Sequence, residues 1–143
     1  MNESELAQHE EYVARLISAR EYTGRQIYGK LLRRGVPESE AIAMTERLEN
    51  AGLIDDSRYA VLFAASREDW GVTRIRAELV RRGVASETAK QEVPIDEEAD
   101  LLKALNLVEG WRCFVTAEKI KGRLLRRGFS SRVVRQAMEQ SCL

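Results

Sequence analysis

Cysteine and histidine are scarce in this 143-residue chain, which has two cysteines and one histidine. Cys113 and Cys142 are too few for a disulfide framework, and neither has a second Cys or a His at the spacing of metal ligands. We interpret both as packed or incidental thiols. The sequence therefore predicts neither a disulfide scaffold nor a metal site.

Long apolar runs are also missing. No stretch approaches the roughly 20 apolar residues that a membrane-spanning helix needs. The first residues, Met1–Glu5, are acidic, whereas a signal peptide would begin with basic and then apolar residues. We therefore expect no membrane contact and a protein that stays in the cytoplasm. We also expect a monomer.

Residues that could carry catalysis are equally few. The single histidine, His9, stands in an acidic stretch, which is typical of a solvated residue. Asp55 and Asp56 could act as paired carboxylates, but they directly precede a helical pattern, where carboxylates cap a helix. Trp70 also precedes a predicted helix, so we interpret it as a core residue rather than a base-stacking one. With no Gly-rich phosphate loop either, we expect no catalytic residue, no cofactor and a function in binding.

Proline and glycine, with two and nine residues, are infrequent. Hydrophobic residues make up 44% of the chain and charged residues 32%, proportions that are typical of a folded protein. Alternating apolar and polar patterns, which would predict strands, are absent. The sequence thus predicts an all-α fold, either as one ordinary domain or as a few small units.

The charges sum to a formal net value of zero, yet they are segregated along the chain. Residues 22–35 have four basic and no acidic side chains, whereas residues 36–70 have three basic and eight acidic ones. Residues 110–143 have eight basic and two acidic side chains. Because positive and negative segments alternate three times, an internal repeat is indicated.

The repeat is visible in three segments that align without a gap: Ile27–Val36, Ile75–Val84 and Ile120–Phe129. Their shared pattern is Ile-x-x-x-Leu-[Leu/Val]-Arg-Arg-Gly-[Val/Phe]. The glycines are 48 and 45 residues apart, which leaves room for about three short helices per repeat. We therefore divide the chain into three helical repeats, which span residues 1–52, 53–94 and 95–143.

Residues that begin and end helices recur in each repeat. Thr23 with Gln26 forms a capping box, Thr116 is an N-cap in the third repeat, and Gly71 holds that place in the second. Further N-caps are expected at Asp55 or Asp56, Ser86 and Ser130. Helix ends with a left-handed residue are expected at Gly35, Gly83 and Gly128. We predict helices near residues 8–20, 23–34, 37–51, 56–69, 72–82, 86–93, 96–109, 116–127 and 130–140.

The middle helix of each repeat has an apolar face at positions i, i+4 and i+5 from its isoleucine, which predicts a core face. This face consists of Ile27, Leu31 and Leu32, of Ile75, Leu79 and Val80, and of Ile120, Leu124 and Leu125. The second arginine of each Arg-Arg pair lies beside this face, so we expect Arg34, Arg82 and Arg127 to lay their stems on apolar surface. The first arginine faces outward, within a basic strip that we predict to bind a partner or nucleic acid. The strip residues are Lys30, Arg33, Arg74, Arg81, Lys119, Arg123 and Arg126.

A specific resemblance rests on two stretches in the second repeat. Residues Leu53–Ala60 read Leu-Ile-Asp-Asp-Ser-Arg-Tyr-Ala, and residues Gly71–Val84 contain Gly-x-x-Arg-Ile-x-x-Glu-Leu-x-x-Arg-Gly-Val. These elements resemble the RecX family of bacterial regulatory proteins, and the first and third repeats match its flanking repeats. The resemblance implies tandem three-helix repeats in a curved, elongated array. It also implies a protein that binds the RecA recombinase, lies in the groove of the RecA–DNA filament, and inhibits strand exchange and ATP hydrolysis, with direct DNA binding in some members.

Two other functions stay open. One is a DNA-binding protein that acts without a recombinase, contacting single- or double-stranded DNA through phosphates rather than through base edges. A helix-turn-helix reader of duplex sequence fits less well, because an acidic helix follows the basic helix of the first repeat. The other is a small hydrolase without a recognisable site. Stacked helical repeats make extended surfaces, which favours the filament-binding interpretation.

Overall fold

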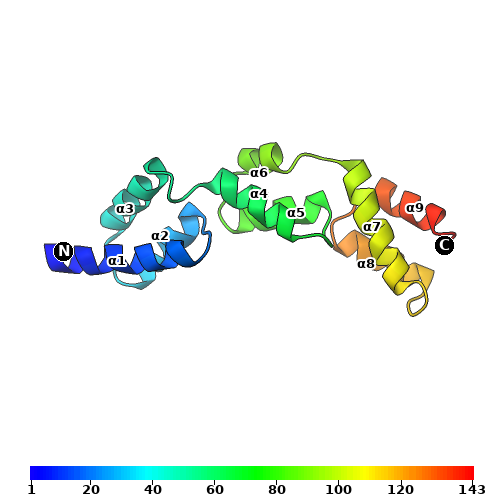
Figure 1. Ribbon diagram of the computed structural model, residues 1–143, viewed down its shortest axis with the longest axis horizontal. Coiled ribbons are helices and arrows are strands. Elements are labelled where there is room, and N and C mark those ends of the chain that lie inside the picture. Colours follow the sequence, from blue (N-terminus) through cyan, green and yellow to red (C-terminus); the bar gives the residue numbers. More distant parts are fainter.

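The computed structural model describes residues 1–143 and contains nine α-helices and no strands (Figure 1). The helices form three consecutive three-helix units, α1–α3, α4–α6 and α7–α9. In chain order they are α1 (Glu3–Ala19), α2 (Gly24–Arg33), α3 (Glu38–Asn50), α4 (Asp56–Ser66), α5 (Val72–Arg81), α6 (Ser86–Glu92), α7 (Glu97–Trp111), α8 (Ala117–Arg126) and α9 (Ser131–Gln140). The predicted all-α fold is confirmed. No helix is long and apolar enough to cross a membrane.

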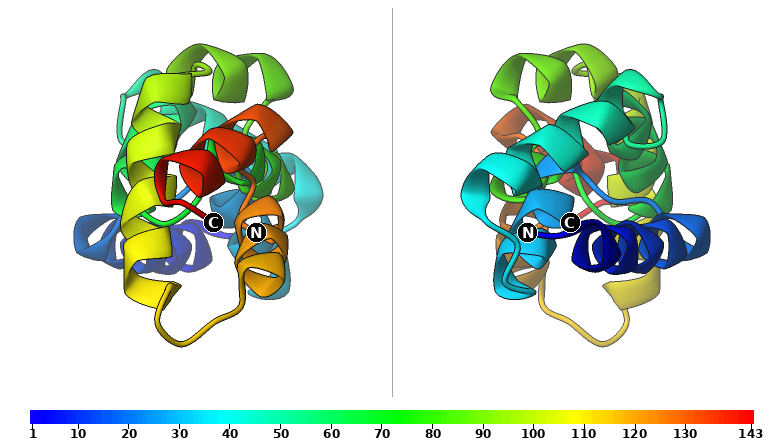
Figure 2. Two further views of the ribbon diagram at one scale, coloured as in Figure 1. Left: turned by 90° about the vertical axis from the view of Figure 1, so that its right-hand side faces the viewer. Right: turned by 90° about the vertical axis from the view of Figure 1, so that its left-hand side faces the viewer.

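The units follow one another in a curved, elongated row, with the two chain termini at opposite ends (Figure 1). Viewed along the long axis, they lie behind one another (Figure 2). This is the tandem array that the repeat pattern and the family resemblance predict. Helix pairs with extensive packing, such as α7 with α9 and α2 with α3, all belong to one unit.

Each unit has its own apolar core, and no core cluster joins two units. The isoleucine and the first leucine of each middle helix are at the centre of these cores, with at most 1% of their surface exposed. These six residues are Ile27, Leu31, Ile75, Leu79, Ile120 and Leu124. The chain between two units also contributes, because Ile54, which precedes α4, is buried in the core of the first unit. Burial of large aliphatic side chains stabilises each unit by about 1.5–3 kcal/mol per residue.

One part of the predicted core face is wrong. Leu32, Val80 and Leu125 are 38%, 42% and 43% exposed, although the sequence places them beside the buried positions. Each lies five residues after the central isoleucine, about 140° around the helix from it. With only two other helices in a unit, the covered arc of the middle helix does not reach that far.

Most of the predicted helix ends are confirmed. Thr23 and Gln26 form the capping box, and the side chains of Asp55, Thr116 and Ser130 each accept a hydrogen bond from a backbone N–H three residues later. The predicted left-handed glycines end the three middle helices with positive φ angles of 93°, 104° and 92° at Gly35, Gly83 and Gly128. Glycine adopts this conformation without the cost that a Cβ atom imposes.

Four boundaries differ from the predictions. Helix α1 begins at Glu3 rather than near residue 8, because the Asn2 side chain caps it by accepting from the N–H of Glu5. Helix α6 has Ala85 as its N-cap, without a side-chain bond, and Ser86 is its first helical residue. Helix α4 ends at Ser66, earlier than predicted, and α7 continues to Trp111, later than predicted.

The units meet where the middle helices join end to end, in reverse chain order. At the first joint, the Thr23 hydroxyl at the start of α2 donates to the carbonyl of Arg82, which ends α5, at 2.7 Å. At the second joint, the N–H of Gly71 at the start of α5 donates to the carbonyl of Arg127, which ends α8, at 2.8 Å. Each contact brings the negative end of one helix dipole to the positive end of the next, which is favourable.

A carboxylate from the following unit completes each joint. Asp56 of α4 accepts a hydrogen bond from the N–H of Gly24 at 3.0 Å, and Asp100 of α7 accepts one from the N–H of Val72 at 3.1 Å. Burial raises the pKa of the Asp100 carboxyl, while the Val72 N–H and the ammonium of Lys103 oppose that rise. Both carboxylates thus satisfy a free N–H at the start of a helix in another unit.

The second joint leaves no room for a side chain at Gly71. A Cβ atom built there would overlap the carbonyl oxygen of Gly128. A Cβ on Gly128 would in turn lie 2.5 Å from the backbone nitrogen of Arg74. Gly71 has a φ of −79°, which any residue can adopt, so close approach alone accounts for glycine there.

Replacing Gly71 with Ala tests this close approach. We expect G71A to lower the free energy of unfolding by about 1–3 kcal/mol, because the added methyl group overlaps backbone and alanine is a poor N-cap. The control is G110A in α7, where no atom lies within 4 Å of the new Cβ. That change should leave stability the same or raise it by up to about 1 kcal/mol. Denaturant unfolding measures both, and equal stability of the two variants would contradict a tight joint.

Candidate functional site

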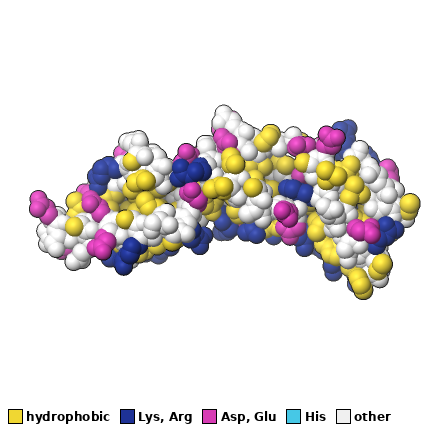
Figure 3. Space-filling view, viewed as in Figure 1, with side chains coloured by type: hydrophobic (Ala, Val, Ile, Leu, Met, Phe, Trp, Pro, Cys, Tyr) yellow, Lys and Arg dark blue, Asp and Glu magenta, His cyan; other side chains and the backbone are white.

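Basic side chains line a shallow groove at each joint. Groove 1, about 520 Å³, lies between the first and second units. Its cations are Arg20, Arg25, Lys30, Arg33, Arg81 and Arg82. Groove 2, about 850 Å³, lies between the second and third units. Its cations are Arg74, Arg123, Arg126 and Arg127, and it also contains one carboxylate, Asp69. In the space-filling view, Lys and Arg side chains gather along the lower edge of the array, beneath its middle part (Figure 3).

The end-to-end joining of the middle helices explains why the grooves are basic. Each Arg-Arg pair sits in the last turn of its helix, where cations interact favourably with the dipole. The next helix of the row starts at that point, so basic residues along it come into the same groove. Arg81 and Arg82 thereby join Arg25 at the first joint, where a Cβ on Gly83 would touch the Arg25 side chain.

An aromatic ring lies beneath the cations in each groove. Tyr22 precedes α2 and has the Arg20 guanidinium carbon 5.1 Å and the Lys30 nitrogen 5.5 Å from its ring centre. Trp70 precedes α5, and the Arg74 guanidinium carbon lies 4.0 Å from its ring centre. These cation–π contacts hold the charged groups in place without neutralising them. Trp70 also packs against the core of the second unit, as its predicted core role requires.

The second arginine of each pair lies against an aromatic ring. The guanidinium carbons of Arg34, Arg82 and Arg127 are 4.1, 4.5 and 5.1 Å from the ring centres of Tyr12, Phe63 and Trp111. Arg82 and Arg127 are half-buried, whereas Arg34 is exposed. Arg127 also pairs with Asp69 at 2.6 Å. The predicted contact with apolar surface is therefore present, through rings rather than through the aliphatic core.

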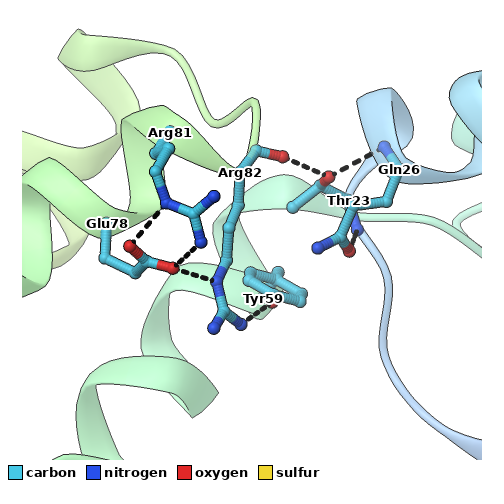
Figure 4. A network of polar contacts seen from close by, with 6 residues as sticks. All are labelled: Thr23, Gln26, Tyr59, Glu78, Arg81 and Arg82. Carbon is cyan, nitrogen blue, oxygen red and sulfur yellow. Dashed lines mark hydrogen bonds and ion pairs between the residues drawn. The ribbon is translucent and has the colours of Figure 1, made fainter.

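Glu78 fixes both arginines of the second unit. Its carboxylate accepts hydrogen bonds from Arg81 and from Arg82, and Arg82 also donates to the Tyr59 hydroxyl at 2.7 Å (Figure 4). The Arg82 carbonyl holds Thr23 of the first unit in the same view. The network thus links the groove arginines to the joint.

Six of the seven predicted binding residues line the grooves. Lys30, Arg33 and Arg81 lie in groove 1, and Arg74, Arg123 and Arg126 lie in groove 2. Lys119 lines neither groove, because it lies in the first turn of α8, whereas groove 2 is at the other end of that helix. Four further cations line the grooves and were not predicted as binding residues, which are Arg20, Arg25, Arg82 and Arg127. Residues Ser18–Glu21 are similar to residues Ala65–Glu68, which follow 47 positions later, and this partial repeat could have indicated Arg20.

Other candidate groups have local structural roles. His9 accepts a hydrogen bond from Arg34 through its Nδ1 atom at 3.0 Å. Asp55 caps its own helix, and Asp56 caps α2 of the first unit. Cys113 and Cys142 are both exposed thiols and are not packed. No group of three or more His, Cys, Asp and Glu side chains is arranged to hold a metal ion.

The pKa of Glu78 is lowered to about 2, first by the hydrogen bond from Arg81 and then by that from Arg82. A folded-state pKa below the ordinary value of 4.5 means that the ionised carboxylate stabilises the folded protein. This stability is fully present above pH 4.5 and is lost as the pH falls through about 2. The Arg81 side chain is 72% exposed, so solvent screening reduces the contribution of that pair.

Replacing Glu78 with Gln tests the network. At neutral pH we expect E78Q to lower the free energy of unfolding by about 1–2 kcal/mol, because two charge-assisted hydrogen bonds are weakened. The difference from the unmodified protein should shrink as the pH falls below 4.5 and vanish near 2. As a control, E11Q removes an exposed carboxylate of α1 that has no ion pair. A difference in the free energy of unfolding between E78Q and the unmodified protein that stays constant across the acid range would contradict the role of Glu78.

The chain resembles known proteins over most of its length. A family model described as RecX, second three-helix domain, matches residues 55–92. A regulatory protein RecX of Trichlorobacter lovleyi is 36% identical over 140 residues, which cover 88% of this chain and 90% of that protein. A regulatory protein RecX of Halorhodospira halophila is 36% identical over 132 residues, which cover 86% of this chain and 81% of that protein.

Solved structures show the same fold. The crystal structure of RecX from Lactobacillus salivarius matches with a TM-score of 0.84 and 19% identity, covering 96% of both chains. A second crystal structure, of regulatory protein RecX, matches with a TM-score of 0.81 and covers 93% of this chain and 72% of that chain. These matches show the fold, and the two sequence relatives, at 36% identity over more than four fifths of each chain, show that this chain belongs to the RecX family of regulatory proteins.

Proposed function

We propose that this protein is a non-enzymatic regulator that binds the filament of the RecA recombinase through grooves 1 and 2 and inhibits its recombination and ATPase activities. Membership of the RecX family supports the regulatory role, and the resemblance to this family implies RecA as the partner. The observation that carries the proposal is the clustering of cations from both units at each joint. Six of them line groove 1 without a carboxylate among the lining residues.

The shape of the molecule fits a long partner. A row of units that contact only their neighbours presents an extended surface rather than an enclosed pocket. Both grooves are shallow and open, which suits contact with the surface of a filament. A filament repeats its own surface at intervals, so one chain can engage it at two joints at once.

The chemistry of the grooves favours an anionic surface. Such a surface is offered by the phosphates of filament-bound DNA or by acidic side chains of the recombinase. We assign the binding role to the six predicted residues that line the grooves, which are Lys30, Arg33, Arg74, Arg81, Arg123 and Arg126. Lys119 has a weaker case, since it lies outside both grooves.

Charge reversal in both grooves tests the proposal. We expect the double variant R33E/R126E to lose inhibition of RecA strand exchange by at least about tenfold, because each groove then repels an anionic partner. Both arginines are exposed and have no ion pair, so helix content and thermal midpoint should stay close to those of the unmodified protein. Strand-exchange and ATPase assays with circular dichroism measure these effects.

The matched control is R15E/R135E. It changes the net charge by the same amount at two exposed arginines of α1 and α9 that line neither groove. This control should inhibit like the unmodified protein. If both double variants lose inhibition equally, net charge matters rather than the grooves. If R33E/R126E is folded and inhibits normally, the binding surface lies elsewhere.

A second candidate function is direct binding of DNA without the recombinase. The same cations support it, because arginine and lysine contact phosphates in any sequence. The grooves contain one amide side chain, Gln26, so they offer little chemistry for reading base edges.

Direct DNA binding, where it is measured, should be independent of sequence and sensitive to salt. We expect the logarithm of the association constant to fall linearly with the logarithm of the salt concentration, with a slope of about −0.7 to −0.9 per phosphate contact. Fluorescence anisotropy with several unrelated oligonucleotides measures both properties. A flat salt dependence, or strong preference for one duplex, would remove the phosphate-contact model.

A further inference from the structure

No apolar core cluster is shared across the two joints, which are crossed by hydrogen bonds and ion pairs. The three apolar cores are separate, and each extensive helix–helix contact lies within one unit. The first joint is held by the Thr23 hydroxyl, the Asp56 carboxylate and an ion pair of Arg58 with Glu21 at 2.8 Å. A joint without a shared apolar core opens at low cost, because few buried contacts are lost.

Each groove takes its cations from both sides of a joint. In groove 1, four cations belong to the first unit and two, Arg81 and Arg82, belong to the second. In groove 2, Arg74 belongs to the second unit and three cations belong to the third. Like charges that face each other across a joint oppose its closure. A bound anion that contacts both sides reverses this effect.

We propose that a chain of phosphates binds across grooves 1 and 2 and holds the two joints closed, so that the array becomes stiffer. This inference rests on the proposed function, because it uses the same two grooves, and it adds that binding there controls the stiffness of the array. Because the complete groove exists only when the joint is closed, the ligand must favour the closed state. By the same linkage, a closed joint binds the ligand more tightly.

Two features of the grooves fit a chain of phosphates as the ligand. Nine of the ten groove cations are arginine, whose planar fork matches phosphate oxygens in two parallel hydrogen bonds. The cations of one groove are also spread over two units, so a chain of several charges can contact both sides where a single small ion cannot. A nucleic-acid strand and inorganic polyphosphate share this chemistry.

Three backbone amides report directly on the joints. The N–H of Gly24 bonds to Asp56 at the first joint, and those of Gly71 and Val72 bond to Arg127 and Asp100 at the second. The acceptor of each bond belongs to the next unit, so hydrogen exchange at these amides requires only that a joint opens. The amides of Ile27 and Ile75, which bond to carbonyls one turn back at Thr23 and Gly71, serve as internal controls.

Amide-resolved hydrogen exchange on the full-length chain tests the proposal. With a saturating oligothymidine strand, hydrogen exchange at Gly24, Gly71 and Val72 should slow by about tenfold. Such a slowing corresponds to a tenfold decrease in the equilibrium constant for opening the joints. Exchange at Ile27 and Ile75 should change much less. Inorganic tripolyphosphate is the second arm: equal slowing assigns the effect to phosphates in general, and slowing by the strand alone assigns it to nucleic acid.

Single-groove variants separate the two joints. R126Q weakens groove 2 and should reduce the slowing at Gly71 and Val72 while preserving it at Gly24. R33Q weakens groove 1 and should have the opposite pattern.

The proposal is overturned if neither phosphate probe binds, if all amides slow alike, or if polyglutamate of equal charge slows exchange at the joint amides as strongly. If the strand binds but exchange at the joint amides is unchanged, joint closure is contradicted, while the proposed inhibition of RecA is unaffected. If the strand slows exchange at the joints but the protein does not inhibit RecA, the proposed function is contradicted instead.

Discussion

The rest of the structure depends on the end of one helix fitting against the start of another. The Arg-Arg-Gly turn ends a middle helix, and at two of its three occurrences it is covered by the preceding unit. Gly83 and Gly128 meet two requirements there, a positive φ angle and an approach too close for a Cβ atom. Because the carbonyl before each glycine also accepts the inter-unit hydrogen bond, one short motif ends the helix and places the next unit.

The sequence predicts what is local and misses what is made between units. The capping box, the left-handed glycines and the buried isoleucines follow from neighbours within about one helical turn, and the structure has them. The capping of α2 by Asp56 depends on residues 32 positions apart, and no periodicity encodes such a contact. Arg25 was missed as a groove cation for the same reason, whereas Arg82 and Arg127 were expected to contact only apolar surface. Leu125 and its two counterparts were misjudged because an apolar pattern does not reveal how many helices cover it.

The two ends of the array differ from the joints in ways that the repeat explains. The residue two before the N-cap of a middle helix is Glu21 in the first unit and Asp69 in the second, and each pairs with an arginine of the next unit. In the third unit the equivalent residue is Phe114, which is 88% exposed. At the other end, no atom lies within 4 Å of a Cβ built on Gly35. The joint chemistry is therefore present only where a neighbour exists.

The structural and binding roles of the Arg-Arg pairs differ between the units. In the first unit Arg33 is free of ion pairs, so its charge is available to a partner. In the second unit Arg81 and Arg82 share Glu78, and Arg82 also bonds Tyr59, so a change at either one alters the network that holds the joint. The loss of a groove charge at Arg81 is thus inseparable from a change in the joint. At Arg33 and Arg126 the two effects are separate, and there the binding role of the grooves can be measured by itself.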